Sequence, residues 1–186
     1  MDKSKQLKAL NAKLDDLCSS TASELSANVV HGEGDPDSLV VFVGEAPGKE
    51  EDVQRRPFVG PVGGILTSAI EAAGWRRSDA YITNVVKCRP PNNRQPRKSE
   101  VQLFLPYLKQ ELEIVKPRVV CLLGATALKS LTGKTLAEAC GKAFEMDGSR
   151  YFCTYHPAAL IYNVSLKKLF IDHIRLLRKT AESPEP

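Results

Sequence analysis

Four short apolar runs constrain the fold of this 186-residue chain more than any other feature. They are rich in β-branched residues and cover residues 39–43, 80–83, 119–123 and 151–154. Apolar runs without polar alternation are typical of strands buried on both faces of a parallel sheet. Segments in which apolar residues recur at helical spacing separate these runs. Strands that alternate with helices predict an α/β fold with a mostly parallel sheet.

The length of the chain predicts a single domain, which we place at residues 1–181, with a free tail at residues 182–186. A domain of this size buries enough surface to fold without disulfides or metals. No apolar run approaches the ~18 residues of a membrane span, and the charged N-terminus is unlike a secretory signal. We therefore expect a cytoplasmic protein.

The five cysteines are an odd number and include no CxxC pair, which argues against a disulfide framework and against an evident metal site. Cys121 and Cys153 lie within apolar runs and are expected to be small buried residues. The net charge is only +4, but residues 87–98 contain five basic residues and no acid. Such a segment is either a solvated face or a surface that contacts phosphates.

Polar side chains follow three of the four expected strands directly. Glu45 comes after the first strand, Asn84 after the second and His156 after the fourth. Ligands of open α/β sheets bind beyond the carboxyl ends of the strands. We therefore expect these three side chains to meet at one pocket.

Two loops near this edge of the sheet carry further candidates. The loop at residues 44–52 has two glycines, which allow close approach of a ligand, and four acidic residues. The segment at residues 57–60 places Phe58 next to glycine, so that its ring is either a core residue or a stacking platform for a flat ligand.

Four motifs in this order resemble the signature of the family 4 uracil-DNA glycosylases. The motifs are Gly-Glu-Ala-Pro-Gly from Gly44, Pro-Phe-Val-Gly from Pro57, Thr-Asn-Val-Val-Lys-Cys-Arg-Pro-Pro from Thr83, and Thr-Tyr-His-Pro-Ala-Ala from Thr154. The resemblance implies a three-layer α/β/α sandwich around a central four-stranded parallel sheet. It also implies hydrolysis of the N-glycosidic bond of uracil in DNA, which leaves an abasic site and initiates base excision repair.

The resemblance assigns roles to individual residues, and these roles are chemically reasonable for an enzyme that flips a base into a pocket. Phe58 matches the stacking aromatic residue, and Asn84 matches the residue that reads the base, since one amide can accept from uracil N3–H and donate to O4. His156 matches a donor toward O2, where negative charge builds up on the leaving uracil. Glu45 and Glu51 match acidic positions that activate water or stabilise the sugar, and which of them acts stays open. Gly44 and Ala46 would supply close backbone contacts to the base.

The resemblance also assigns a DNA-contacting face to the chain. This face consists of the basic segment and the loop after the histidine: Lys87, Arg89, Arg94, Arg97, Lys98, Pro157 and Ala158. Contacts to phosphates there would give affinity without sequence preference. We expect the partner to be uracil-containing DNA, single- or double-stranded, and the protein to be a monomer.

The chain departs from this family at the cysteines that hold a 4Fe–4S cluster. Cys88 keeps one ligand position, but the N-terminal pair is broken, because Asp15 and Thr21 stand where a partner of Cys18 would lie. The fourth position falls on Phe104 or Leu103. Such a cluster normally requires four thiolates. We therefore expect no cluster and no other cofactor, with the Phe104 side chain directed toward the core.

Three alternatives to an ordinary glycosylase come from the residues. A branch of the superfamily that traps DNA covalently uses a histidine in a basic loop. This branch is disfavoured, because no histidine lies between Cys88 and Ser99. A catalytically silent relative that kept the pocket is disfavoured by the presence of all the expected pocket residues. A flavodoxin-like domain that binds a small molecule is disfavoured by the basic segment at residues 87–98.

Overall fold

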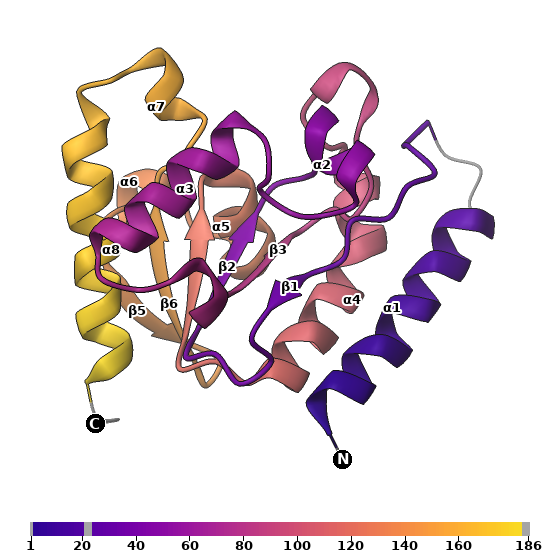
Figure 1. Ribbon diagram of the computed structural model, residues 1–186, viewed down its shortest axis with the longest axis horizontal. Helices are drawn as coiled ribbons and strands as arrows, with labels where there is room; N and C mark the ends of the chain where they lie inside the picture. The colour runs from indigo at the N-terminus through magenta and orange to yellow at the C-terminus, as the bar shows by residue number, and fades with distance from the viewer. Residues whose placement is uncertain (1, 21–23, 184–186) are drawn as a thin grey trace.

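The centre of the fold is a parallel sheet built from the four apolar runs. Its strands are β2 (Val40–Gly44), β3 (Tyr81–Asn84), β4 (Val119–Leu123) and β6 (Ser149–Thr154), in the order β3-β2-β4-β6. The computed structural model describes residues 2–20 and 24–183 (Figure 1). Every residue of β2, β3 and β4 is buried, as expected of strands covered on both faces.

The sheet has six strands, so the expectation of four holds only for its parallel centre. The two added strands are β1 (Glu33–Gly34), antiparallel to β3, and β5 (Ala143–Met146), antiparallel to β6. Both lie at the edges of the sheet and keep partly exposed residues. Because edge strands are short and need no continuous apolar run, the sequence pattern did not reveal them.

Eight α-helices connect and cover the strands in the described part of the chain. They are α1 (Lys3–Ser20), α2 (Lys49–Gln54), α3 (Pro61–Ala72), α4 (Lys98–Val115), α5 (Ala125–Thr132), α6 (Leu136–Ala139), α7 (Ala159–Tyr162) and α8 (Leu166–Glu182). Short 3₁₀ turns lie at Arg77–Asp79 and Pro91–Asn93. In the described residues, no helix is both long enough and apolar enough to cross a bilayer.

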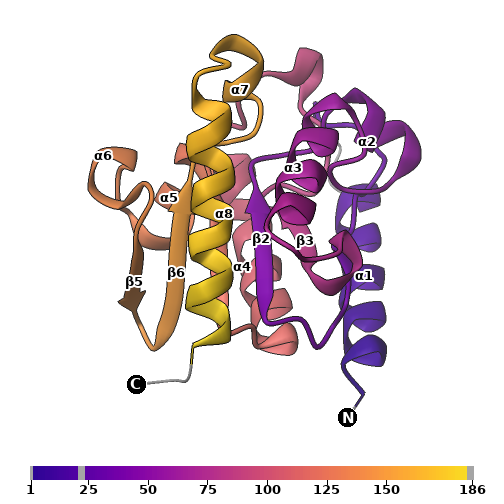
Figure 2. The same cartoon turned by 60° about the vertical axis from the view of Figure 1, so that its left-hand side comes forward.

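The helices form a layer on each face of the sheet, which confirms the three-layer sandwich. Val41 and Val43 of β2 face a core shared with α1, α4 and α5, whereas Val40 and Phe42 face a core shared with α3 and α8. Figure 2 shows α8 running along one face of the sheet, with α1 and α4 on the far side. This alternation follows from the period of two along a strand.

Phe104 lies where the sequence analysis expects it. Its side chain is 1% exposed and belongs to the same core cluster as Leu14 of α1 and Cys88. Cys121 and Cys153 are likewise buried, as predicted. At the other end of the chain, α8 continues through residue 182, the first residue of the expected tail, and residues 184–186 lie outside the described part.

Candidate active site

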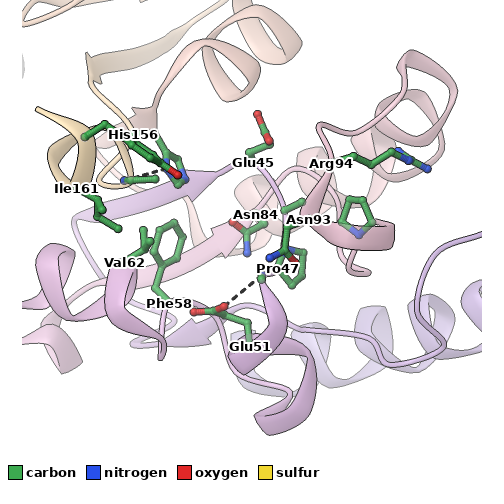
Figure 3. A pocket seen from close by; sticks show the side chains of 15 residues that line it. Glu45, Pro47, Glu51, Phe58, Val62, Asn84, Asn93, Arg94, His156 and Ile161 are labelled. Carbon is green, nitrogen blue, oxygen red and sulfur yellow. Dashed lines mark hydrogen bonds between the residues drawn. The ribbon is translucent and has the colours of Figure 1, made fainter.

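A pocket of about 340 Å³ lies beyond the carboxyl ends of the parallel strands (Figure 3). Its lining includes Glu45, Phe58, Asn84 and His156, which come from four separate parts of the sequence. The parallel register explains how two of them meet, because Gly44 at the end of β2 is paired with Asn84 at the end of β3. The structure therefore brings the expected strand-end residues together.

Gly44 is needed for the close packing at the floor of the pocket. A Cβ atom at this position would lie 2.4 Å from Oδ1 of Asn84 and 2.5 Å from Cζ of Phe58. Both distances are below any ordinary carbon contact, so a side chain at Gly44 would displace the amide or the ring. The glycine thus lets the amide of Asn84 and the ring of Phe58 lie side by side.

Asn84 presents an unsatisfied acceptor to the pocket. The residue is 2% exposed, and its Oδ1 atom is buried without a hydrogen-bond partner in the described structure. Buried polar atoms are nearly always paired, because an unpaired one costs about 1–3 kcal/mol. An unpaired amide oxygen that faces a pocket is therefore suited to a ligand that brings an N–H donor.

Phe58 is held over the pocket by a backbone clamp. Its φ of 52° is in the left-handed region, which is unusual for an aromatic residue. Glu51 accepts hydrogen bonds from the next two backbone N–H groups, those of Val59 at 3.0 Å and Gly60 at 2.8 Å, and from that of Gly48 at 3.2 Å. The carboxylate of Glu51 therefore fixes the turn that carries the ring. Figure 3 shows it below Phe58, with a dashed line for its bond to the N–H of Gly48, next to Pro47.

Glu45 is oriented by a residue that the sequence analysis missed. The hydroxyl of Thr126, at the start of α5, donates a hydrogen bond to Oε2 of Glu45, and the side-chain amide of Gln95 donates to the same hydroxyl at 3.3 Å. In Figure 3 the Glu45 carboxylate points away from Asn84, toward the outer part of the pocket. Thr126 follows the third apolar run by only three residues, so its position after a strand was the signal that could have identified it.

His156 is neutral, and its proton is placed by the backbone. Burial lowers the pKa of its imidazole to about 4, because water that would solvate the charged ring is excluded. The N–H of Ala158 donates to Nδ1 at 3.3 Å, so the proton of the neutral ring lies on Nε2. The ring centroid lies 5.9 Å from that of Phe58. His156 therefore offers an uncharged N–H donor beside the aromatic ring.

The loop after His156 begins with a buried proline. The carbonyl group of Pro157 accepts from the N–H of Leu160 in the turn that starts α7, and its contact with DNA stays a prediction. Ala158 lines the pocket, as does Ala46. Two exposed apolar side chains of α7 also line the pocket, those of Ile161, 52% exposed, and Tyr162, 90% exposed, and the sequence analysis did not single them out.

Lys87 is buried, so its assignment to a DNA-contacting face is wrong. The side chain has no exposed surface, and its ammonium group is paired with Glu111 of α4, which is 1% exposed. Thr83 and Tyr81 donate to the same carboxylate. Burial lowers the pKa of the Lys87 ammonium, while Glu111 opposes this shift. The absence of acids within residues 87–98 was misleading, because the neutralising acid, Glu111, lies 24 positions further along the chain in α4.

Two of the expected basic residues have acidic partners as well. Arg94 pairs with Glu100 at 2.6 Å, and Arg97 pairs with Glu24 at 2.9 Å. Arg94 nevertheless lines the pocket. Arg89 is half-buried, and its guanidinium donates to the side-chain oxygen of Asn93 at 2.7 Å. Lys98 is exposed.

The thiols that the structure brings together do not fit an iron–sulfur cluster. The Sγ atoms of Cys18 and Cys88 lie 2.9 Å apart, but the fourth family position falls on Phe104 or Leu103, neither of which can bind iron, and Thr21 lies outside the described residues. Within residues 2–20 and 24–183, no group of three or more histidine, cysteine and acidic side chains could hold a metal ion. Two thiolates are half of the four that a 4Fe–4S cluster requires.

Comparisons with known proteins agree with this geometry. The profile of the uracil DNA glycosylase superfamily matches residues 31–178. The chain is 47% identical over 153 residues to the type-4 uracil-DNA glycosylase of Pyrobaculum aerophilum, covering 77% of this chain and 78% of the relative. The corresponding enzyme of Thermotoga maritima is 44% identical over 153 residues (79% and 80%), and that of Sulfurisphaera tokodaii is 39% identical over 174 residues (87% and 79%). With this pocket and these relatives, the chain belongs to the uracil-DNA glycosylase superfamily.

Proposed function

We propose that this protein is a monofunctional uracil-DNA glycosylase, which hydrolyses the N-glycosidic bond of uracil in DNA and thereby initiates base excision repair. The observation that carries the proposal is the buried, unpaired Oδ1 atom of Asn84 at the floor of a pocket flanked by Phe58 and His156. Uracil supplies what this site lacks, because its N3–H group is a donor and its O4 atom an acceptor. Cytosine presents the opposite pattern to the same amide.

The base enters the pocket by flipping out of the DNA stack. The ring of Phe58 stacks on the base, which replaces part of the stacking lost on flipping. Asn84 then accepts from N3–H through Oδ1 and donates to O4 through Nδ2. Thymine differs from uracil by a methyl group at C5. Because Gly44, Phe58 and Asn84 are closely packed, these residues cannot move apart freely to make room for that methyl group.

His156 stabilises the leaving group. As the bond between C1′ of the sugar and N1 of uracil breaks, the electron pair stays on the base, and negative charge builds up on O2. The Nε2–H group of neutral His156 donates to O2 without having to transfer its proton. Preorganised donors of this kind typically contribute a factor of about 10²–10³ to the rate.

Glu45 is the residue that activates water in this proposal. One of its carboxylate oxygens accepts from Thr126, which leaves the other to accept a proton from the water that attacks C1′. The water oxygen bonds to C1′, and the product is an abasic site. Glu51 is occupied by three backbone N–H groups, and its role is to position Phe58.

The surface around the pocket serves to hold DNA. In this proposal, phosphates are contacted by Arg94, which lines the pocket, and by the exposed Lys98, and Arg89 and Arg97 extend this surface. Tyr162 and Ile161 are exposed apolar side chains next to the pocket, suited to contact bases around the flipped nucleotide. We further propose that the enzyme acts as a cytoplasmic monomer, on single- or double-stranded DNA, without an iron–sulfur cluster.

A direct assay tests the activity. Oligonucleotides that differ only in having uracil, thymine or cytosine at one position are incubated with excess protein, single-stranded and annealed, and then treated with alkali. Strand cleavage is expected with uracil alone. The variant His156→Ala, checked for a normal melting curve, is the matched control for a contaminating glycosylase. Absence of cleavage on both uracil substrates with folded protein would mean a silent relative that kept the pocket.

A further inference from the structure

Two cysteines that lie far apart in the sequence meet outside the pocket. Cys18 lies in the last turn of α1, and Cys88 follows β3; they are separated by 70 positions, and their Sγ atoms are 2.9 Å apart. Cys88 is 1% exposed, whereas Cys18 is half-buried and can be reached from solvent. Among the five thiols, this is the pair whose sulfur atoms are in direct contact.

The backbone around Cys88 is fixed on both sides. The N–H of Val30 donates to the carbonyl of Lys87 at 2.8 Å, and that of Ser26 donates to the carbonyl of Arg89 at 3.0 Å. Cys88 itself forms an isolated antiparallel bridge with Val29. The backbone at Cys88 is therefore fixed by hydrogen bonds, whereas Cys18 lies near the end of α1, where small adjustments of the chain are least costly.

The surroundings of the pair favour a bond between the sulfurs over a bound metal. Phe104 and Leu14 pack in the same core cluster as Cys88 and supply no ligand atoms. Asp15, an acid one turn before Cys18 on α1, is paired with His31 at 3.1 Å. A disulfide needs the sulfur atoms to approach from 2.9 Å to about 2.05 Å, a change of less than about 1 Å.

We propose that Cys18 and Cys88 form a reversible dithiol–disulfide pair, which takes up a low-molecular-weight disulfide such as oxidised glutathione as its oxidant. The Cys18 thiolate, the accessible one, attacks a sulfur of glutathione disulfide, forms a mixed disulfide and releases one glutathione thiolate. The Cys88 thiolate then attacks the Cys18 sulfur and releases the second glutathione. Two protein thiols are oxidised, one small disulfide is reduced to two thiols, and the two protein protons pass to the released thiolates.

The bond would join α1 to the segment that forms one wall of the pocket. Pro90, Asn93 and Arg94, which follow Cys88, line that pocket. The covalent loop of residues 18–88 would also contain Glu45, Phe58 and Asn84. A cross-link across a loop of this length restricts the unfolded chain, and we expect the melting temperature to rise by about 4–16 °C. Neither cysteine lines the pocket, so catalysis at low temperature should be unchanged.

The test uses the full chain, reduced or treated with glutathione disulfide and then alkylated. Trypsin should leave Cys18 in peptide 14–49 and Cys88 in peptide 88–94, since proline follows Arg89. Mass spectrometry of the oxidised protein is expected to find these two peptides linked, about 2 Da lighter than their sum. Reductant should separate the peptides and reverse the rise in melting temperature.

Single variants separate this pair from the other thiols. Cys18→Ser and Cys88→Ser should each lose the rise in melting temperature caused by the oxidant, when each oxidised variant is compared with its own reduced form. Cys140→Ser, a half-buried thiol outside the pair, should keep the full response. Glutathione adducts without the linked peptide, or the same temperature shift in Cys88→Ser, would overturn the proposal. Stoichiometric iron in protein purified without air would overturn it as well.

Discussion

The hydroxyl of Thr126 donates a hydrogen bond to the carboxylate of Glu45 and so joins the start of α5 to the loop after β2. The side-chain amide of Gln95 donates to the same hydroxyl at 3.3 Å, so Thr126 also connects Glu45 to the basic segment at residues 87–98. Glu45 is thus held by a neutral donor that leaves its second oxygen to accept from water. The relationship singles out Thr126 as a positioning residue for the proposed water-activating group.

Replacing Thr126 tests this role. Thr126→Val keeps the shape of the side chain but removes the donor, and a hydrogen bond to a charged group is worth about 1.5–3 kcal/mol. We expect kcat to fall by about 10- to 100-fold with KM little changed, because Thr126 does not touch the base. Thr126→Ser, which restores the donor, should recover most of the rate. Equal losses in Val and Ser variants would assign Thr126 to packing alone.

Asn84→Asp tests the reading of the base. A carboxylate cannot donate to O4 of uracil, and it meets that oxygen with its own negative charge. A site built on hydrogen bonds typically loses several kcal/mol when one partner is removed, so single-turnover excision of uracil should fall by at least about 10³-fold. The melting temperature is the control, since the wild-type amide oxygen is already unpaired. A wild-type rate in Asn84→Asp would remove Asn84 as the reader.

Glu51 separates positioning from base catalysis. Gln at this position keeps a carbonyl oxygen that can accept from Val59 and Gly60, whereas Ala loses the clamp altogether. We expect Glu51→Gln to keep kcat within about 10-fold of wild type, and Glu51→Ala to raise KM further because Phe58 is no longer held. Steady-state kinetics on single-stranded uracil substrate gives both constants. If Gln were as inactive as Ala, Glu51 would be the general base.

The pattern of the sequence predicted the buried parts of this fold well. Continuous apolar runs identify β2 and β4 because strands covered on both faces contain little else. The edge strands β1 and β5 escaped because they are short and partly exposed and therefore have no continuous apolar run. Lys87 was misplaced for a similar reason. Its partner Glu111 is distant in the sequence, and local charge counts do not include such partners.

The candidate site was also predictable only in part from the sequence. His156 and Asn84 were predictable, because they follow strands whose carboxyl ends must meet. Thr126 and the clamp around Glu51 were not, because each depends on where a backbone N–H or hydroxyl points after folding. Their contribution is therefore visible only in the structure.

The pH dependence tests the state of His156. Its pKa is about 4 in the folded protein and near 6.5 in the unfolded chain, so folding favours the neutral ring. The resulting stability is complete above pH 6.5 and is lost as the pH falls toward 4. We expect no change in kcat that titrates near pH 6.5, because the donor is already neutral there. NMR of the imidazole should report the same low pKa, and a value near 6.5 would contradict a buried neutral donor.

Lys87 and Lys98 form a matched pair for the corrected DNA-contacting face. Lys87→Met leaves the buried carboxylate of Glu111 without its cation, which typically costs about 3–5 kcal/mol, a fall in melting temperature of about 6–20 °C. Lys98→Met removes an exposed charge, so stability should stay within about 0.5 kcal/mol of wild type.

Binding to DNA should show the reverse order. Lys98→Met is expected to weaken affinity and to lower the salt dependence by about one phosphate contact, whereas folded Lys87→Met should bind DNA with the salt dependence of wild type. Fluorescence anisotropy with an abasic-site oligonucleotide at several salt concentrations measures both. The double variant Lys87→Met with Glu111→Leu separates the two roles further, because replacing a buried ion pair by apolar residues is often neutral or stabilising. If the double variant regained stability but its DNA affinity depended less on salt, by about one phosphate contact as in Lys98→Met, Lys87 would return to the DNA-contacting face.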